Sequence, residues 1–307
     1  MLYNKVKRIL RSIIETNNAI IESNKSIIES NNAIIESNNA INNLKELFVQ
    51  NEIDRIKDSP RHKKPKPLGS YGSKIYSQND EDGIISEIFS RIGTTNNTFV
   101  EFGIGNGLEN NTIALLFDNW NGLWIDASTR SVEDINKNLN KIIKSGKLKV
   151  IESFITKNNI NELISNNIDS TEIDLLSVDL DGNDYHVLNA ITCISPRVIV
   201  IEYNAKFTPP TSFCMDYDES HTWKGDDCFG ASLKFLEKNI DGYCLVGCNL
   251  NGVNAFFVRQ DLVGDNFLNP FTAENHYEPA RYYLSGFPSG HPAAYSTLEK
   301  SLTMRFT

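Results

Sequence analysis

The chain has no long apolar run and little cysteine, and both absences narrow what it can be. No stretch of about 20 consecutive apolar residues occurs, so the sequence predicts no membrane-spanning helix. Its five cysteines lie between Cys193 and Cys248, an odd number without metal-ligand spacing. This pattern favours free thiols in a reducing, cytoplasmic compartment over a disulfide framework. The apolar stretch near the N-terminus ends at Glu15, which is too early for a secretory signal.

Positive charge is scarce in most of the chain. Residues 1–58 carry eight Lys and Arg against eight Asp and Glu, whereas residues 69–307 carry 18 against 31, a net charge of −13. Residues 69–307 are acidic enough to repel the phosphate backbone of a nucleic acid, and we therefore expect no nucleic-acid partner. The excess of carboxylates is compatible with a bound divalent cation.

The N-terminal segment repeats a seven-residue unit, beginning with Ser-Ile-Ile-Glu-Thr-Asn-Asn at Ser12. We predict a heptad-repeat coiled coil over residues 1–58 that joins copies of the chain into a homo-oligomer. Isoleucine at a and asparagine at d favour three or more strands; these positions are Ile14, Ile21, Ile28 and Ile35, and Asn17, Asn24, Asn31 and Asn38. An Asn-rich tail without a defined partner is the alternative. The basic start is also compatible with peripheral contact at the inner face of a membrane.

A basic, proline-containing segment at 59–70 predicts a stiff, solvated linker, because its prolines cannot continue a helix. Beyond it, residues 71–307 alternate between strand-like apolar runs and segments of helical length. Strands are expected at 98–102, 122–125, 148–152, 173–178, 197–202, 242–246 and 255–259, and helices at 79–91, 131–145, 159–165 and 230–238. This alternation predicts an α/β domain with a doubly wound sheet that ends in an antiparallel hairpin.

The most informative motif spans residues 98–112. A short apolar run contains Glu101 near its end and is followed by Gly103, Gly105 and Gly107 at alternate positions. Glycines let the backbone approach a ligand closely, which is typical of a nucleotide-binding turn. Dinucleotide folds use G-x-G-x-x-G facing an anionic pyrophosphate, whereas Glu101 favours the cationic S-adenosylmethionine. Asp126 ends the next apolar run, where it is placed to bind ribose hydroxyls in either cofactor.

Carboxylates also follow two later strands. Asp179, Asp181 and Asp184 come directly after the run 173–178, and Glu202 ends the run 197–202. If these strands are neighbours, the carboxylates converge beside the glycine loop, where like charges need a cation or raised pKa values. Oxygen ligands suit Mg²⁺ or Mn²⁺, and such an ion lowers the pKa of a bound hydroxyl.

Two histidines are candidate general bases in the absence of a metal. His186 follows the acids in a stretch of helical character, and His221 lies in a polar loop. That loop, residues 207–229, also contains Trp223 and is expected to cover the acceptor. The aromatic side chains there either stack on a sugar ring or pack the loop itself.

Five segments together resemble the FkbM-type methyltransferases. They are residues 76–82, 101–112, 125–126, 178–184 and 201–204, in that order. The resemblance implies a class I S-adenosylmethionine-dependent methyltransferase fold that methylates an oxygen of a sugar, nucleotide sugar or glycan. A role in bacterial capsule or lipopolysaccharide biosynthesis follows from the same resemblance.

The resemblance also implies site residues. Those expected at the cofactor are Gln78, Glu101, Gly103, Gly105, Asn111, Asp126, Phe154 and Asp179. Similarity to metal-dependent sugar O-methyltransferases adds Asp179, Asp181 and Glu202 as metal ligands, and the candidate catalytic residues are Asp179, His186 and His221. Family members carry Asp-Val-Glu-Gly-Ala-Glu where this chain has Asp-Leu-Asp-Gly-Asn-Asp, so two acidic side chains are shorter here.

Two other functions are alternatives. An oligomeric scaffold with a non-catalytic methyltransferase-like domain is favoured by the heptads and opposed by the acids after both strands. A nicotinamide-dependent oxidoreductase is opposed by the spacing of the glycines.

Overall fold

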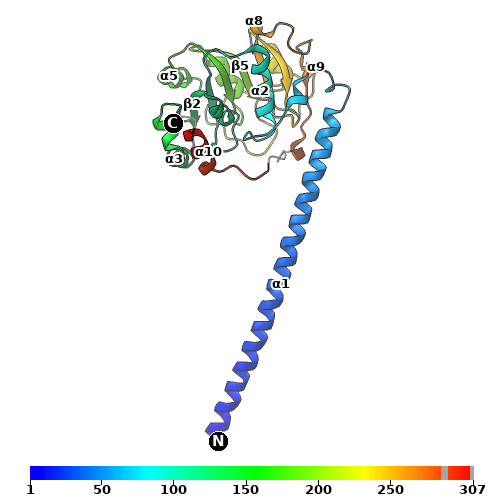
Figure 1. Ribbon diagram of the computed structural model, residues 1–307, viewed down its shortest axis with the longest axis vertical. Coiled ribbons are helices and arrows are strands. Elements are labelled where there is room, and N and C mark those ends of the chain that lie inside the picture. Colours follow the sequence, from blue (N-terminus) through cyan, green and yellow to red (C-terminus); the bar gives the residue numbers. More distant parts are fainter. Residues whose placement is uncertain (285–289, 305–307) are drawn as a thin grey trace. The chain divides into compact units, whose positions relative to one another are not determined.

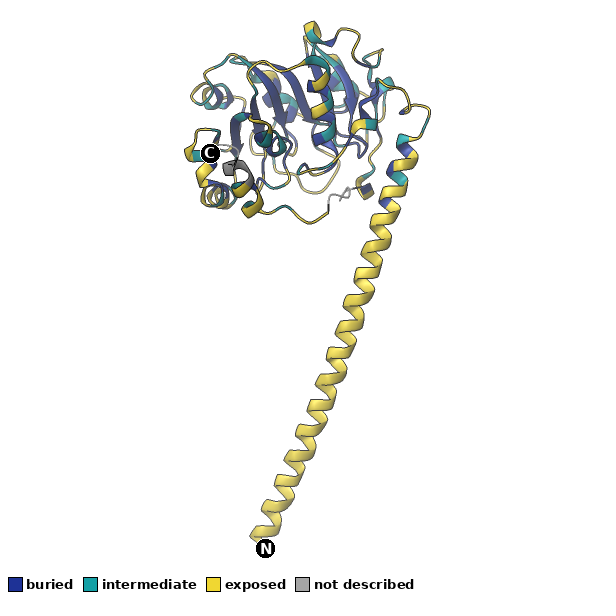
Figure 2. Cartoon of the chain, in the orientation of Figure 1, coloured by how far each residue is buried: buried dark blue, intermediate teal, exposed yellow. Residues whose placement is uncertain are grey.

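The computed structural model describes residues 1–284 and 290–304, and it forms two compact units, Met1–Asn51 and Glu52–Thr307. The first unit is helical throughout: helix α1 (Leu2–Lys57) covers it and continues past its boundary. Most of α1 is exposed (Figure 2), and the isoleucines of its seven-residue repeat are among the exposed residues, whereas Ile53 and Ile56 near its end are buried. The helix expected for the N-terminal segment is therefore confirmed. Over the described residues, no helix combines the length and apolar composition that a bilayer span needs.

A seven-stranded sheet forms the centre of the second unit (Figure 1). Its strands are β1 (Thr98–Phe102), β2 (Asn121–Asp126), β3 (Leu148–Glu152), β4 (Glu172–Val178), β5 (Ser195–Glu202), β6 (Tyr243–Cys248) and β7 (Asn254–Arg259). Their spatial order is β3-β2-β1-β4-β5-β7-β6, and β7 runs antiparallel to both of its neighbours. This is the Rossmann-like, doubly wound sheet of the class I methyltransferase fold, as the sequence predicts.

Helices cover both faces of the sheet, so its central strands are apolar on both sides. Alternate residues of a strand enter different cores: in β1, Phe99 packs into one cluster and Val100 into the other. The first core is closed by α2 (Glu81–Ile92), α3 (Thr129–Asn138), α4 (Asn140–Lys144) and α10 (Tyr295–Met304). The second is closed by α5 (Ile160–Ser165), α6 (Asp184–Ala190) and α7 (Leu233–Asn239).

The shorter elements lie between these strands and helices or after them. They are η1 (Leu68–Tyr71), η2 (Ile113–Asp118), α8 (Gln260–Val263), α9 (Ala273–His276) and η3 (Tyr282–Leu284).

Most expected elements differ from the observed ones by one to three residues at an end, and two of these differences have a visible cause. The helix expected at 131–145 is divided at Leu139 into α3 and α4, and α3 starts earlier because the Ser128 hydroxyl accepts from the Ser131 N–H at its N-terminus. The strand expected at 242–246 is β6, which begins after Gly242 because that glycine has a φ of +81°. It continues to Cys248 through an irregularity between Leu245 and Gly247. The antiparallel hairpin at the sheet edge is confirmed.

The segment 59–70 is not the solvated linker expected from its prolines. Pro60 follows the end of α1 closely, but His62 and Leu68 are buried. The Arg91 guanidinium donates to the carbonyls of Pro65 and Lys66, which fixes this stretch on the second unit. The prolines indicate where helix α1 ends. They do not indicate whether the segment that follows packs on the rest of the second unit.

Candidate functional site

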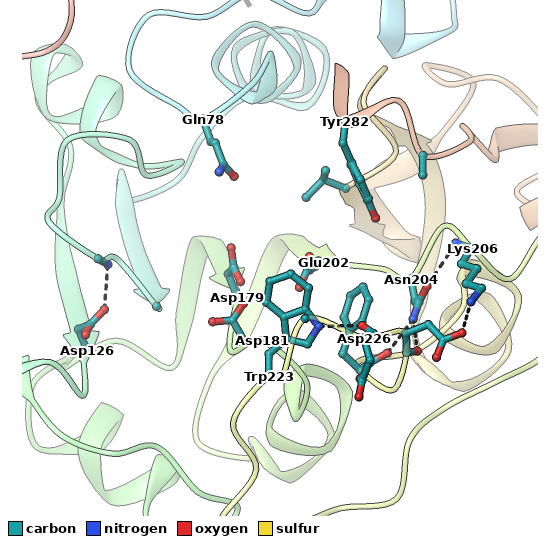
Figure 3. Close-up of a pocket in the computed structure, with 17 residues that line it drawn as sticks. Gln78, Asp126, Asp179, Asp181, Glu202, Asn204, Lys206, Trp223, Asp226 and Tyr282 are labelled. Carbon is teal, nitrogen blue, oxygen red and sulfur yellow. Dashed lines mark hydrogen bonds and ion pairs between the residues drawn. The ribbon is translucent and has the colours of Figure 1, made fainter. Parts of the chain in front are cut away.

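The carboxyl ends of the parallel strands meet at one edge of the sheet, where two cavities open. The larger has a volume of about 1080 Å³ and the smaller about 370 Å³. They adjoin at the switch point between β1 and β4, since both are lined by Gly103, Asp126, Asp179, Asp181 and Trp223. Figure 3 shows the residues that line the larger cavity. Open α/β sheets bind ligands at this place. We refer to the two cavities together as the cleft.

Gly103 brings the loop after β1 against the loop after β4. Its N–H donates to the Ile125 carbonyl at 3.1 Å, and its φ is +70°. A Cβ at this position would stand 1.7 Å from the carbonyl oxygen of Asp179. Only glycine fits here, and the close approach places Asp179 beside the glycine loop.

Glu101 anchors the segment that follows the glycine loop. Its carboxylate accepts from the Asn111 N–H at 2.7 Å and from the Thr112 N–H and hydroxyl at 3.2 and 2.5 Å. The Asn111 amide in turn donates to the Ser177 hydroxyl. Glu101 and Asn111 are buried and line neither cavity, so the structure gives both of them a supporting position where the sequence predicts contact with the cofactor.

Asp126 lies where the two cavities join. Its carboxylate accepts from the Gly105 N–H at 2.8 Å (Figure 3) and from the Ser128 N–H at 2.7 Å. It is half-buried, so the remaining lone pairs of its oxygens face the cleft. Phe154 lines the smaller cavity and is 50% exposed, which leaves a ring face available there.

Three carboxylates gather after β4 and β5. Asp179, Asp184 and Glu202 each place an oxygen within 4.8 Å of the others. Burial raises the pKa values of Asp179 and Glu202 well above the usual range, and the neighbouring carboxylates raise them further. Asp184 caps its own loop, since its oxygens accept from the N–H groups of Leu180 and Gly182. Asp181, expected as a ligand, lines the cleft but lies outside this group of three.

The two histidines have different surroundings. His221 lines the smaller cavity. The His186 Nε2 lies 2.7 Å from the Met215 carbonyl, and its ring packs edge-on against Tyr217. The structure therefore does not bring His186 to the cleft, because α6 directs it toward the segment around Met215.

Other walls of the larger cavity come from segments far apart in the chain. Gln78, an expected residue, lines it, and its segment is held by Glu81, which accepts from the amides of Asn249 and Asn254. The sequence did not single out Tyr282, which lies beyond the segments with a recognisable motif. The remaining walls include Asn204, Lys206, Asp226, Asp227, Phe229, Val253 and Ala280.

No family model matches the chain, and no curated protein matches it. Among solved structures, it is similar to a Klebsiella pneumoniae protein assigned as an O-methyltransferase, with 15% identity over 67% of this chain and 87% of that one and a TM-score of 0.39. A Staphylococcus aureus protein assigned as a caffeoyl-CoA O-methyltransferase has 13% identity over 69% and 99%, with a TM-score of 0.42.

The glycopeptide N-methyltransferase MtfA, solved with S-adenosylmethionine, has 13% identity over 60% of this chain and 96% of that one, with a TM-score of 0.37. Similarity at these levels carries no information on activity or substrate. The fold rests on the strand order of the sheet itself.

Replacing Gly103 by alanine should destabilise the protein more than the same change at Gly105. Both residues have positive φ, +70° and +52°, and the backbone strain alone costs about 1–3 kcal/mol. Only Gly103→Ala adds a clash with Asp179, since nothing lies within 4 Å of a Cβ at Gly105. Urea unfolding of both variants measures the difference, and equal losses would contradict the close approach.

The free energy of unfolding should fall as the pH rises from 5 to 8. Burial raises the pKa of Glu101 from 4.5 to about 7, against the opposing hydrogen bonds from Thr112 and Asn111. The folded chain therefore keeps a proton that the unfolded chain releases, and this stabilisation is full below about pH 4.5 and lost as the pH rises through about 7. Glu101→Gln should make the decline shallower in urea titrations at several pH values. The exposed Glu109→Gln should leave it unchanged, and identical slopes in all three proteins would refute the assignment.

Proposed function

We propose that this chain is an S-adenosylmethionine-dependent methyltransferase that acts on a sugar hydroxyl. The observation that carries the proposal is the cleft itself. At the switch point of a class I methyltransferase fold, it joins a wall containing Asp126 and Phe154 to a carboxylate group containing Asp179 and Glu202. One wall suits a nucleoside, and the other suits a cation or a hydroxyl group.

The groups that line the cleft fit S-adenosylmethionine. The Asp126 carboxylate accepts hydrogen bonds, as ribose hydroxyls require, and the exposed face of Phe154 suits an adenine ring. The open space at Gly105 leaves the backbone accessible, and the carboxylates beyond Gly103 suit a sulfonium and an ammonium group. When bound, the cofactor supplies an electrophilic methyl group.

The chain's own contribution is to position and deprotonate the acceptor. A carboxylate whose pKa burial raises, as at Asp179 and Glu202, takes up a proton from a hydroxyl more readily than an ordinary one does. The same two carboxylates make no hydrogen bond within the described residues and would hold Mg²⁺ or Mn²⁺, which would lower the pKa of the hydroxyl. Holding the acceptor in line is the larger part of such catalysis.

A sugar acceptor is supported by the walls of the larger cavity and by the sequence motifs. Trp223 and Tyr282 offer aromatic surfaces, and Asn204 offers an amide, a combination that suits the apolar and polar faces of a sugar ring. The motifs that resemble FkbM-type enzymes support an oxygen acceptor on a sugar, nucleotide sugar or glycan of a bacterial surface polysaccharide. The five free cysteines fit a reducing compartment such as the cytoplasm.

S-Adenosylhomocysteine should bind the full chain with a micromolar Kd, and Asp126→Ala should weaken this binding at least tenfold, since it removes the acceptor for the ribose. Asp126→Asn, which retains one oxygen, should weaken it less. Calorimetric titration measures all three, with Asp265→Ala, at an exposed carboxylate, as the control.

If protein with a folded circular dichroism spectrum did not bind S-adenosylhomocysteine, the proposed enzymatic function would be rejected. The scaffold would then be the surviving function.

Asp179→Asn and Glu202→Gln should each lower methyl transfer at least 100-fold, because a lost general base or ligand costs about 10²–10⁴ in rate. Glu202→Gln should do so while S-adenosylhomocysteine still binds. Asp181→Asn is the matched control, since this acid lines the cleft outside the group of three. Transfer is measured with labelled cofactor on the sugar or oligosaccharide that screening identifies, with Mg²⁺ and with chelator. Equal rates of methyl transfer in all variants would refute the roles assigned to Asp179 and Glu202. Equal rates with Mg²⁺ and with chelator would refute the involvement of a metal ion.

A further inference from the structure

Helix α1 has an apolar stripe that nothing covers within the described residues. Pairs of adjacent isoleucines recur every seventh residue and end with a single one; they are Ile13 and Ile14, Ile20 and Ile21, Ile27 and Ile28, Ile34 and Ile35, and then Ile41. Each is between 51% and 64% exposed. A face this apolar and regular is stable in water only when it is covered.

The seven-residue spacing favours another helix as the cover. A straight helix drifts by about 20° for each heptad relative to a seven-residue repeat, so the stripe winds slowly around α1. A partner helix follows this path by supercoiling, whereas a flat surface cannot follow it over four heptads.

Asparagines within the stripe identify the partner more closely. Asn17, Asn24, Asn31 and Asn38 each lie three residues after an isoleucine pair, on the same face. Their amides both donate and accept, so a lipid surface would leave them without partners. A second copy in register places asparagine against asparagine at each d layer, between layers of isoleucine. The flanking Glu15, Glu22, Glu29 and Glu36 would in addition repel an anionic bilayer.

The ends of the stripe distinguish parallel from antiparallel pairing. An antiparallel pair that matches Asn17 with Asn38 also places Lys7, one heptad before Ile14, against Phe48, one heptad after Ile41. A charged group would then lie against an apolar one. In a parallel pair, the exposed Phe48 meets its own copy and extends the seam.

We propose that three copies of this chain assemble through α1 into a parallel, in-register coiled coil, with the asparagines as internal polar layers. Paired isoleucines make the stripe wider than the seam of a two-stranded coil, which favours the third helix. Polar residues at the seam fix register and copy number. The assembly is independent of the proposed enzymatic function.

Sedimentation equilibrium of the full chain tests the copy number. We expect three times the chain mass of 34.6 kDa at micromolar concentration. The double variant Ile21→Lys, Ile28→Lys should sediment as a monomer, because it places charge inside the seam. The matched variant Ser26→Lys, Ala33→Lys, on the opposite face, should stay trimeric. Monomeric or dimeric wild-type protein, or equal dissociation of both variants, would overturn the proposal.

A cysteine at Asn17 tests the orientation. In the parallel coil, Asn17→Cys lies beside its own copy and should form an interchain disulfide under mild oxidation, which the wild-type chain should not form. In the antiparallel pair, the two cysteines stand 21 residues apart along the helices, about 32 Å, and no disulfide forms. Flotation with anionic phosphatidylserine vesicles completes the test, since monomeric protein that floats would assign the stripe to lipid instead.

Discussion

The close approach of Gly103 to the carbonyl oxygen of Asp179 fixes the two loops at the centre of the cleft. It brings together the loops after two adjacent strands, β1 and β4, at the point where the order of the sheet reverses. Because no side chain fits between them, the glycine loop and the acidic loop form one wall. Asp126 is tied to this wall because its side-chain carboxylate accepts from the Gly105 N–H.

Buried negative charge is the second constraint on the molecule. Asp179 and Glu202 face one another across the ends of β4 and β5, and burial disfavours the ionised form of both. Folding therefore maintains an arrangement that would relax if either acid gained a cation or a proton. Unsatisfied charge of this kind is common where a protein binds or transforms a ligand. Asp179 and Glu202, whose burial lowers the stability of the fold, are therefore the best candidates for a role in catalysis.

The sequence predicted the strands closely, because apolar runs covered on both faces leave a clear signal. It also predicted Asp126 and Asp179 at the cleft, since strand ends are visible as the points where such runs stop. It did not predict the supporting position of Glu101, because an acid before a glycine loop looks the same whether it faces a ligand or its own backbone. The face of α6 on which His186 lies and the position of Tyr282 at the cleft both depend on packing between distant segments. Local sequence patterns do not encode such packing.

The position of β7 has a consequence for synthesis on the ribosome. β7 is the last strand to emerge, yet it lies between β5 and β6. Until residues 254–259 are made, β5 has an unpaired edge that carries Val198, Ile199, Val200 and Ile201 in succession. Such an edge invites pairing with other chains. The nascent domain thus depends on a late insertion to protect the apolar run of β5, and chains stalled before that point would be strongly prone to aggregate.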